Sequence, residues 1–169
     1  MGDNAPVTTD REILTYELFG TAVQELARQV VDGGYEPDLV LSIARGGLGL
    51  GMGLGYALDV KNLSAINVEF YTGVDERLDV PIMLPPTPDA VDLAGLKVLI
   101  ADDVADTGKT LEIVRDFCAD HVAEARMAVI YEKPWTVIRP DFVWRRTEAW
   151  IDFPWSSTPP LVRRPRPGR

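Results

Sequence analysis

The chain has 169 residues, of which 46% are apolar, and it carries a formal net charge of -9. This length fits one domain with a hydrophobic core. We expect no membrane span, because no apolar run approaches the roughly 20 residues that one needs, and no signal peptide, because the first residues lack a basic segment followed by an apolar one. The acidic charge argues against a general nucleic-acid surface, although a local nest of backbone N–H groups can still bind a small polyanion.

The regular elements of the chain alternate between strands and helices. Residues 16–32 carry apolar side chains at helical spacing, with Thr15 able to cap the start and Gly33-Gly34 able to end it. The pattern also predicts a glycine-rich helix at 47–60 and a crossover helix at 109–121. Continuous apolar runs predict strands at 38–44, 63–71, 97–102 and 125–133. This alternation predicts an α/β fold, a mostly parallel twisted sheet with helices on both faces.

Three segments fit neither helical nor strand spacing. Residues 72–95 are rich in prolines and acids, and they predict a flexible hood. Residues 134–155 are aromatic and irregular, and we expect a small appendage across one end of the sheet. Residues 156–169 are rich in proline and arginine and predict a solvated tail. We therefore predict a single domain over residues 1–155, followed by this tail.

The stretch "VLIADDVADTGKT" at 98–110 combines acids with a phosphate-binding turn. An apolar strand brings Asp102 and Asp103 to the carboxyl edge of the sheet, where open α/β folds bind ligands. The turn at 107–110 opens a helix whose unsatisfied N–H groups and dipole favour phosphate. It is not a Walker A loop, because Asp103 stands where that motif has its first glycine. Acids after a strand can merely cap a helix, but here the combination favours a monophosphate beside carboxylates that accept sugar hydroxyls or hold Mg²⁺.

Two further basic residues are predicted at the same edge of the sheet. In "SIARGGLGLG" at 42–51, Arg45 follows a strand and precedes a Gly-Gly turn. A guanidinium beside backbone N–H groups suits a diphosphate, although glycine turns are frequent. Lys133 ends the fourth predicted strand, where a lysine is often only solvated.

The stretch at 98–110 resembles the phosphoribosyl diphosphate (PRPP) signature of the type I phosphoribosyltransferases, and the resemblance extends over about residues 12–155. The chain is most similar to the 6-oxopurine branch, the xanthine, guanine and hypoxanthine enzymes. This resemblance implies a Mg²⁺-dependent transfer of the phosphoribosyl group from PRPP to a purine base in purine salvage, by a cytoplasmic homodimer or homotetramer. Two alternatives stay open: transfer to orotate or adenine, and a regulator that keeps the PRPP-binding fold.

The resemblance also implies roles for residues on the PRPP side of the site. Asp102 and Asp103 would accept the ribose hydroxyls directly or through Mg²⁺. Asp106 would in addition be the general acid or base at N7 of the purine. The pyrophosphate would lie against Ala44, Arg45 and Gly46, with a cis peptide at or just before the arginine. The 5-phosphate would lie in a cradle formed by Asp106, Thr107, Gly108, Lys109 and Thr110.

On the base side, "AWIDFPW" at 149–155 resembles the purine clamp of the same branch. By this resemblance Lys133 would donate a hydrogen bond to O6 of the base, and Trp150 would stack on the ring. Ile151 and Asp152 would read the edge around C2, the aspartate through its backbone or its carboxylate.

Four residues near these motifs are predicted to have structural roles. We expect Trp144, Trp155 and Cys118 to lie in the core, and His121 to cap carbonyl groups at a helix end. As the sole cysteine of the sequence, Cys118 also excludes a disulfide within the chain and suits a reducing cytoplasm.

Overall fold

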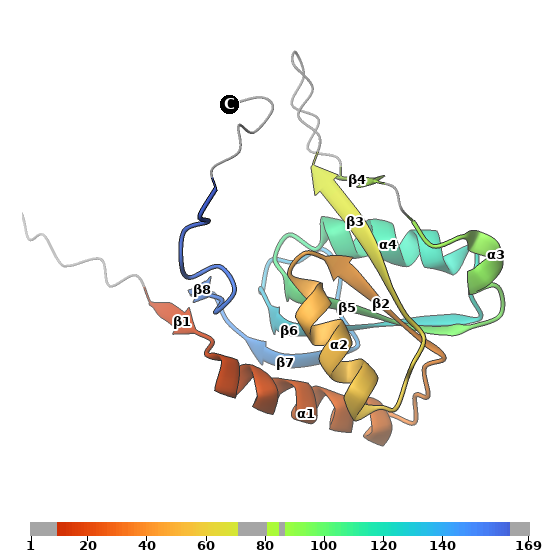
Figure 1. Ribbon diagram of the computed structural model, residues 1–169, viewed down its shortest axis with the longest axis horizontal. Coiled ribbons are helices and arrows are strands. Elements are labelled where there is room, and N and C mark those ends of the chain that lie inside the picture. Colours follow the sequence, from red (N-terminus) through yellow and green to blue (C-terminus); the bar gives the residue numbers. More distant parts are fainter. Residues whose placement is uncertain (1–9, 71–80, 85–86, 163–169) are drawn as a thin grey trace, which may run out of the picture.

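The computed structural model describes residues 10–70, 81–84 and 87–162 of the chain. Its centre is a six-stranded sheet in which every strand runs parallel except one edge strand, as Figure 1 shows. From the antiparallel edge inward, the order is β4 (Pro81–Leu84), β3 (Leu63–Phe70), β2 (Leu39–Ala44), β5 (Lys97–Ala105), β6 (Glu124–Glu132) and β7 (Phe142–Arg146). The predicted α/β fold with a mostly parallel sheet is therefore confirmed.

Helices cover both faces of this sheet (Figure 1). Helices α1 (Tyr16–Asp32) and α2 (Gly47–Ala57) pack on one face, and α4 (Lys109–Ala119) packs on the other with the short α3 (Ala90–Leu93). Successive strand residues point to opposite faces of the sheet. Leu99 of β5 packs towards α1 and α2, whereas Ile100 packs towards α4. Burial on both faces explains why these strands are continuous apolar runs.

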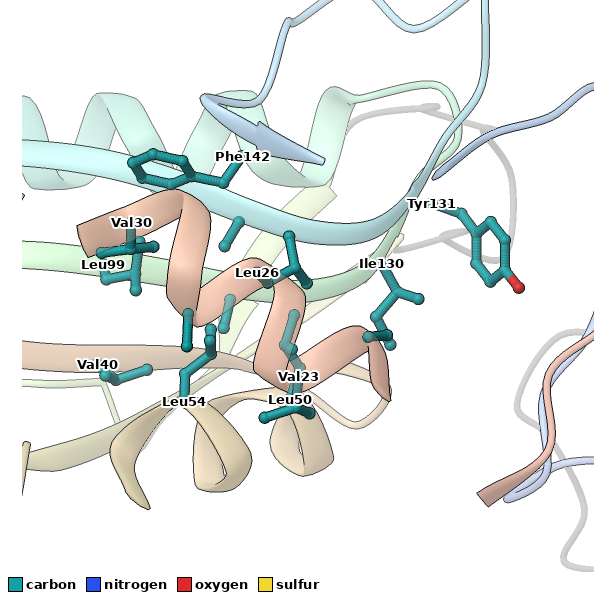
Figure 2. Packing of buried hydrophobic residues seen from close by; sticks show 14 of the residues in the cluster. Val23, Leu26, Val30, Val40, Leu50, Leu54, Leu99, Ile130, Tyr131 and Phe142 are labelled. Carbon is teal, nitrogen blue, oxygen red and sulfur yellow. The ribbon is translucent and has the colours of Figure 1, made fainter. Parts of the chain in front are cut away.

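The core under α1 and α2 depends on close packing of the two helices. Figure 2 shows Val23 and Leu26 of α1 in one buried cluster with Leu50 and Leu54 of α2. The leucines are fully buried, and each contributes roughly 1.5–3 kcal/mol through removal of its side chain from water. The glycines of α2 make this approach possible, since a Cβ on Gly53 would lie 2.8 Å from the methyl carbons of Val23.

The predicted boundaries of α1 are confirmed. Thr15 caps the helix, because its Oγ1 accepts a hydrogen bond from the Leu18 N–H at 3.1 Å. At the other end Gly33 is the C-cap, and Gly34 adopts a positive φ of 65°.

Other boundaries differ from the prediction. Strand β5 continues to Ala105, so Asp102 and Asp103 lie within the strand and not after it. The region 72–95 contains β4 and α3, so it is not a structureless hood; its residues 72–80 and 85–86 lie outside the described part of the chain. The tail is described only as far as residue 162.

The region 134–155 was predicted as an irregular appendage, which is wrong for two of its segments. Strand β7 joins the main sheet beside β6. Strand β8 (Trp150–Asp152) pairs in parallel with β1 (Arg11–Ile13), a strand that the prediction missed, to form a separate two-stranded sheet. The start of the described chain therefore supports the strand that carries the predicted purine-binding residues.

The predicted structural residues have mixed outcomes. Cys118 is fully buried, as expected, and burial raises the pKa of its thiol to about 11. Trp144 and Trp155 are partly buried against the core. The prediction for His121 is wrong: its ring packs on Phe117 with centroids 5.1 Å apart, and its buried Nδ1 has no hydrogen-bond partner among the described residues.

No helix within the described ranges combines the length and the apolar character that crossing a membrane requires.

Candidate active site

A pocket of about 550 Å³ lies at the carboxyl ends of β2 and β5. The chain moves outward from β2 to β3 in one direction and from β5 to β6 in the other, so the two strands flank the switch point of the sheet. Ligands of open α/β folds bind at this position. The pocket is lined by Ile43, Ala44, Gly46, Val68, Asp102, Asp103, Val104, Asp106, Thr107, Gly108, Lys109, Thr110 and Leu111.

The turn after β2 packs directly against the acids of β5. The peptide between Ala44 and Arg45 is cis, at the position the resemblance implied. A Cβ on Gly46 would lie 2.0 Å from Oδ2 of Asp103, and one on Gly47 would lie 2.3 Å from the carbonyl oxygen of Ala101. Only glycine allows this approach at both positions. Ala44 and Gly46 line the pocket as predicted, whereas the exposed Arg45 does not.

The carboxylates of Asp102 and Asp103 form a close, buried pair. Asp102 is 8% exposed, and its Oδ1 accepts a hydrogen bond from the Asp103 N–H at 2.9 Å. Burial, together with the negative charge of Asp103, raises the pKa of Asp102 well above its usual range. Burial also raises the pKa of Asp103, against hydrogen bonds from the Val104 N–H and the Trp155 side chain that lower it. Hydroxyl donors or a cation would therefore stabilise the ionised pair.

The donor set of this pair fits a magnesium ion. No cluster of three or more metal-ligating acids, histidines or cysteines exists among the described residues, so the protein offers a pair of carboxylates and no complete cage. Mg²⁺ is a hard cation that is commonly held by one or two carboxylates, with waters and substrate oxygens completing its shell. Asp102 and Asp103 match this requirement in kind and in number.

The start of α4 forms the phosphate side of the pocket. Gly108 is the N-cap in a left-handed conformation with φ 82° and has no side chain to cap the helix, while the Lys109 N–H makes a long hydrogen bond, 3.4 Å, to the hydroxyl of Thr107. A Cβ on Gly108 would meet Oγ1 of Thr136 at 2.3 Å, so glycine is required by both conformation and space. Uncapped N–H groups and the helix dipole favour a bound phosphate at this end of α4.

Asp106 and Lys133, the two predicted catalytic residues, are linked by a residue that the prediction missed. Oδ1 of Asp106 accepts a hydrogen bond from Nε1 of Trp135 at 2.9 Å. The ammonium nitrogen of Lys133 lies 5.5 Å from the centroid of the Trp135 ring and donates to the carbonyl oxygen of Ala149. Asp106 lines the pocket, whereas Lys133, which is 7% exposed, does not. The sequence pattern gave no indication of this role for Trp135, because the residue lies in a loop that has neither helical nor strand periodicity.

Three of the predicted purine-binding residues, Trp150, Ile151 and Asp152, lie together on β8, outside the lining of this pocket. Trp150 is 68% exposed and free of the core, whereas Ile151 is buried. Both carboxylate oxygens of Asp152 accept hydrogen bonds from Arg11, at 2.7 and 2.5 Å, and these bonds hold the pKa of Asp152 below its usual value. Because this carboxylate is engaged by Arg11, backbone groups are the better candidates to read a base.

These features indicate the class of the protein. Buried carboxylates, a glycine turn and a helix start around one pocket of an α/β fold are typical of a phosphate-binding site at the switch point of the sheet. Comparison with known proteins agrees. Residues 10–160 match the family described as phosphoribosyl transferase domain, and the chain belongs to this family.

Known relatives narrow this assignment. The chain is 32% identical over 122 residues to a xanthine-guanine phosphoribosyltransferase of Ruegeria sp. (strain TM1040), covering 69% of this chain and 66% of that protein. It is 35% identical over 120 residues to the enzyme of the same description from Cereibacter sphaeroides, covering 69% and 67%. The chain thus spans about two thirds of the length of these relatives. The predicted membership in the type I family and its 6-oxopurine branch is confirmed.

Solved structures give the same fold. A purine phosphoribosyltransferase from Pyrococcus horikoshii superposes with a TM-score of 0.77 at 35% identity, covering 91% of this chain and 99% of that chain. A Helicobacter pylori xanthine-guanine-hypoxanthine phosphoribosyltransferase superposes with a TM-score of 0.70 at 23% identity, which supports the fold alone.

Proposed function

We propose that this protein is a purine phosphoribosyltransferase of purine salvage, which transfers the 5-phosphoribosyl group of PRPP to a 6-oxopurine. The observation that carries the proposal is the shared pocket in which Asp102 and Asp103 face the uncapped start of α4. The names of the Ruegeria and Pyrococcus relatives support a purine as acceptor. In this reaction the bond between C1 of the ribose and the pyrophosphate oxygen breaks, and the bond between C1 and N9 of the purine forms.

Different pocket residues bind different groups of the PRPP molecule. Asp102 and Asp103 accept hydrogen bonds from the ribose hydroxyls, while the N–H groups and hydroxyls of residues 107–110 hold the 5-phosphate. The turn at Ala44–Gly46 presents its backbone to the pyrophosphate, and the Arg45 guanidinium adds charge from the rim. Mg²⁺, when bound, would be held by Asp102 and Asp103 and would supply positive charge beside the departing pyrophosphate. The protein's part is positioning and electrostatic stabilisation.

On the base side, Asp106 takes or returns the proton at N7, and Lys133 donates to O6 of the purine. An ammonium group has three donors, so Lys133 can keep its bond to Ala149 and still reach the base. Trp150 has the exposure that a stacking platform needs. The nucleophile is N9, and it inverts the configuration at C1.

We also propose that the protein acts in the cytoplasm as a homodimer or homotetramer. Helix α2 supports self-association, because Leu48, Met52 and Tyr56 lie four residues apart along one face and are 44%, 54% and 86% exposed. Sedimentation of the purified protein tests this: a monomer at micromolar concentration would contradict it.

Pyrophosphate release from PRPP tests the reaction. The assay uses hypoxanthine, guanine, xanthine, adenine and orotate in turn, each with and without Mg²⁺. We expect release with at least one 6-oxopurine, and only when Mg²⁺ is present. Release with adenine or orotate alone, or with no base at all, would reject the proposal.

Asp106→Asn tests the acid–base role within the same assay. We expect turnover to fall about 100-fold, the size of a general acid–base contribution, with little change in PRPP affinity. The matched control is Asp116→Asn, because Asp116 is an exposed aspartate of α4 that pairs with Arg115 and does not line the pocket. An unchanged rate for Asp106→Asn would defeat the assigned role.

A further inference from the structure

Trp135 is a large aromatic residue whose position is not explained by burial. Its side chain is 54% exposed, so it contributes little to the core. Its indole N–H nevertheless donates to Asp106 at 2.9 Å, and the Lys133 ammonium lies over its ring. Its contacts are therefore with the two side chains to which the proposed reaction assigns proton transfer and O6 binding.

The loop that carries Trp135 is attached to the loop of Asp106 on both sides of that residue. The Lys133 N–H donates to the carbonyl oxygen of Ala105, and the Val137 N–H donates to the carbonyl oxygen of Thr107, both at 2.9 Å. The Trp135–Asp106 bond lies between these two, so three alternate residues of the Trp135 loop are held by three consecutive residues, Ala105 to Thr107.

The far end of the Trp135 loop is anchored as well. Thr136 and Ile138 are buried, 8% and 5% exposed, and both pack into the space left by the missing side chain of Gly108. The Thr136 hydroxyl also donates to the carbonyl oxygen of Ile138 at 3.2 Å. The indole is thus presented from an ordered support and can define the direction of the carboxylate that it binds.

We propose that Trp135 is a positioning residue, which holds Oδ1 of Asp106 through its indole N–H so that Oδ2 is left to exchange a proton with the purine. This inference rests on the proposed function, since it assigns Asp106 the proton transfer. A donor fixed on one carboxylate oxygen restricts rotation of the group, in the way that outer partners orient the ligands of a metal site. Trp135 acts through Asp106 and does not itself touch the reacting atoms.

Three variants separate the donor from the ring. Trp135→Phe keeps an aromatic ring and loses the N–H; we expect turnover to fall about 10-fold with the Michaelis constant for PRPP within about 2-fold, because a misoriented catalytic group slows the chemical step. Trp135→Gln places an amide nitrogen the same number of bonds from Cα as Nε1, and we expect it to restore turnover to within about 3-fold of wild type. The control is Trp144→Phe, which removes an equivalent hydrogen bond from an indole N–H, in this case to Glu25 at 2.7 Å and away from the pocket. We expect this control to leave turnover unchanged.

A double variant tests whether Trp135 acts through Asp106. In an Asp106→Asn background, Trp135→Phe should cost less than about 2-fold more, since effects routed through one group are not additive. A full additional 10-fold loss, wild-type turnover of Trp135→Phe, or a Trp135→Gln variant as slow as Trp135→Phe would each overturn the inference.

An NMR measurement keeps the test independent of activity. The indole ¹⁵N–¹H resonance of Trp135, assigned by its absence in Trp135→Phe, should move in Asp106→Ala while that of Trp144 stays in place. An unmoved Trp135 resonance would overturn the inference even in an active enzyme. If the resonance moves but no base yields pyrophosphate, the proposed function fails while the contact between the two residues stands.

Discussion

Gly46→Ala is the sharpest single test of how the pocket is built. Gly46 has helical backbone angles, φ -59° and ψ -37°, so alanine is not strained there by its own conformation. The added Cβ would instead lie 2.0 Å from Oδ2 and 2.3 Å from Cγ of Asp103. Ordinary van der Waals contact begins at 3.4 Å, so the carboxylate oxygen must move by about 1.4 Å.

A displacement of this size falls on the group proposed to hold the ribose hydroxyls. Misplacing a reacting or positioning group by about 1 Å can cost about 100-fold in rate, so we expect kcat/KM for PRPP to fall about 100-fold. The assay is pyrophosphate release at varied PRPP, with thermal unfolding by circular dichroism to show that the variant is folded.

Gly49→Ala is the matched control on the same helix. Its Cβ would have Phe19 as nearest neighbour at 3.4 Å, an ordinary contact. We expect unchanged kcat/KM and a stability gain of about 0.5–1 kcal/mol, because alanine replaces glycine inside a helix. Wild-type kcat/KM for Gly46→Ala would refute the reasoning, since it would mean that Asp103 can leave its place without consequence.

Three further predictions concern other parts of the molecule. Trp150→Ala should raise the Michaelis constant of the base about 10-fold and that of PRPP much less, as loss of a stacking platform does; equal effects in steady-state kinetics would argue against stacking. Hydrogen bonds from Arg139 and Arg146 hold the pKa of the buried Glu132 below its usual value, although burial alone would raise it. The lowered pKa of Glu132 stabilises the fold at pH values above its unfolded pKa, and this stabilisation is lost as the pH falls through the folded pKa. Glu132→Gln should therefore cost about 1–2 kcal/mol at pH 7 in thermal melts, and this cost should shrink progressively as the pH is lowered below the unfolded value of 4.5. Burial with a pKa of about 11 should keep Cys118 unreactive to a thiol reagent at neutral pH until urea unfolds the chain, and a fast native reaction would contradict its burial.

The central elements of the fold could be predicted because burial on two faces leaves a direct mark in the sequence. Strand β2 was expected at 38–44 and spans Leu39–Ala44. The short strands β1 and β8 could not be predicted in this way, since three residues carry no periodicity. Their pairing depends on partners far apart in the chain, such as Arg11 with Asp152.

The site shows the same contrast between features that local sequence patterns predict and contacts that depend on distant segments. The motifs at 42–51 and 98–110 predicted most of the pocket lining, because residues that end neighbouring parallel strands meet at one edge of the sheet. The contact between Trp135 and Asp106 could not be read from either motif. It depends on the register between two loops, which is set by backbone bonds such as that from Lys133 to Ala105.

The pairing of β1 with β8 has a consequence for biosynthesis. During translation, the segments that form the phosphate pocket are complete once residue 111 has left the ribosome. Strand β8, by contrast, is synthesised after these segments, whereas its partner β1 is synthesised before them. The residues proposed to bind the sugar donor are therefore synthesised before those proposed to select the base, and the base-selecting part can form only when residues 150–152 pair with β1. Deleting Arg11–Ile13 would consequently remove the strand that pairs with Trp150–Asp152, about 140 residues further along the chain.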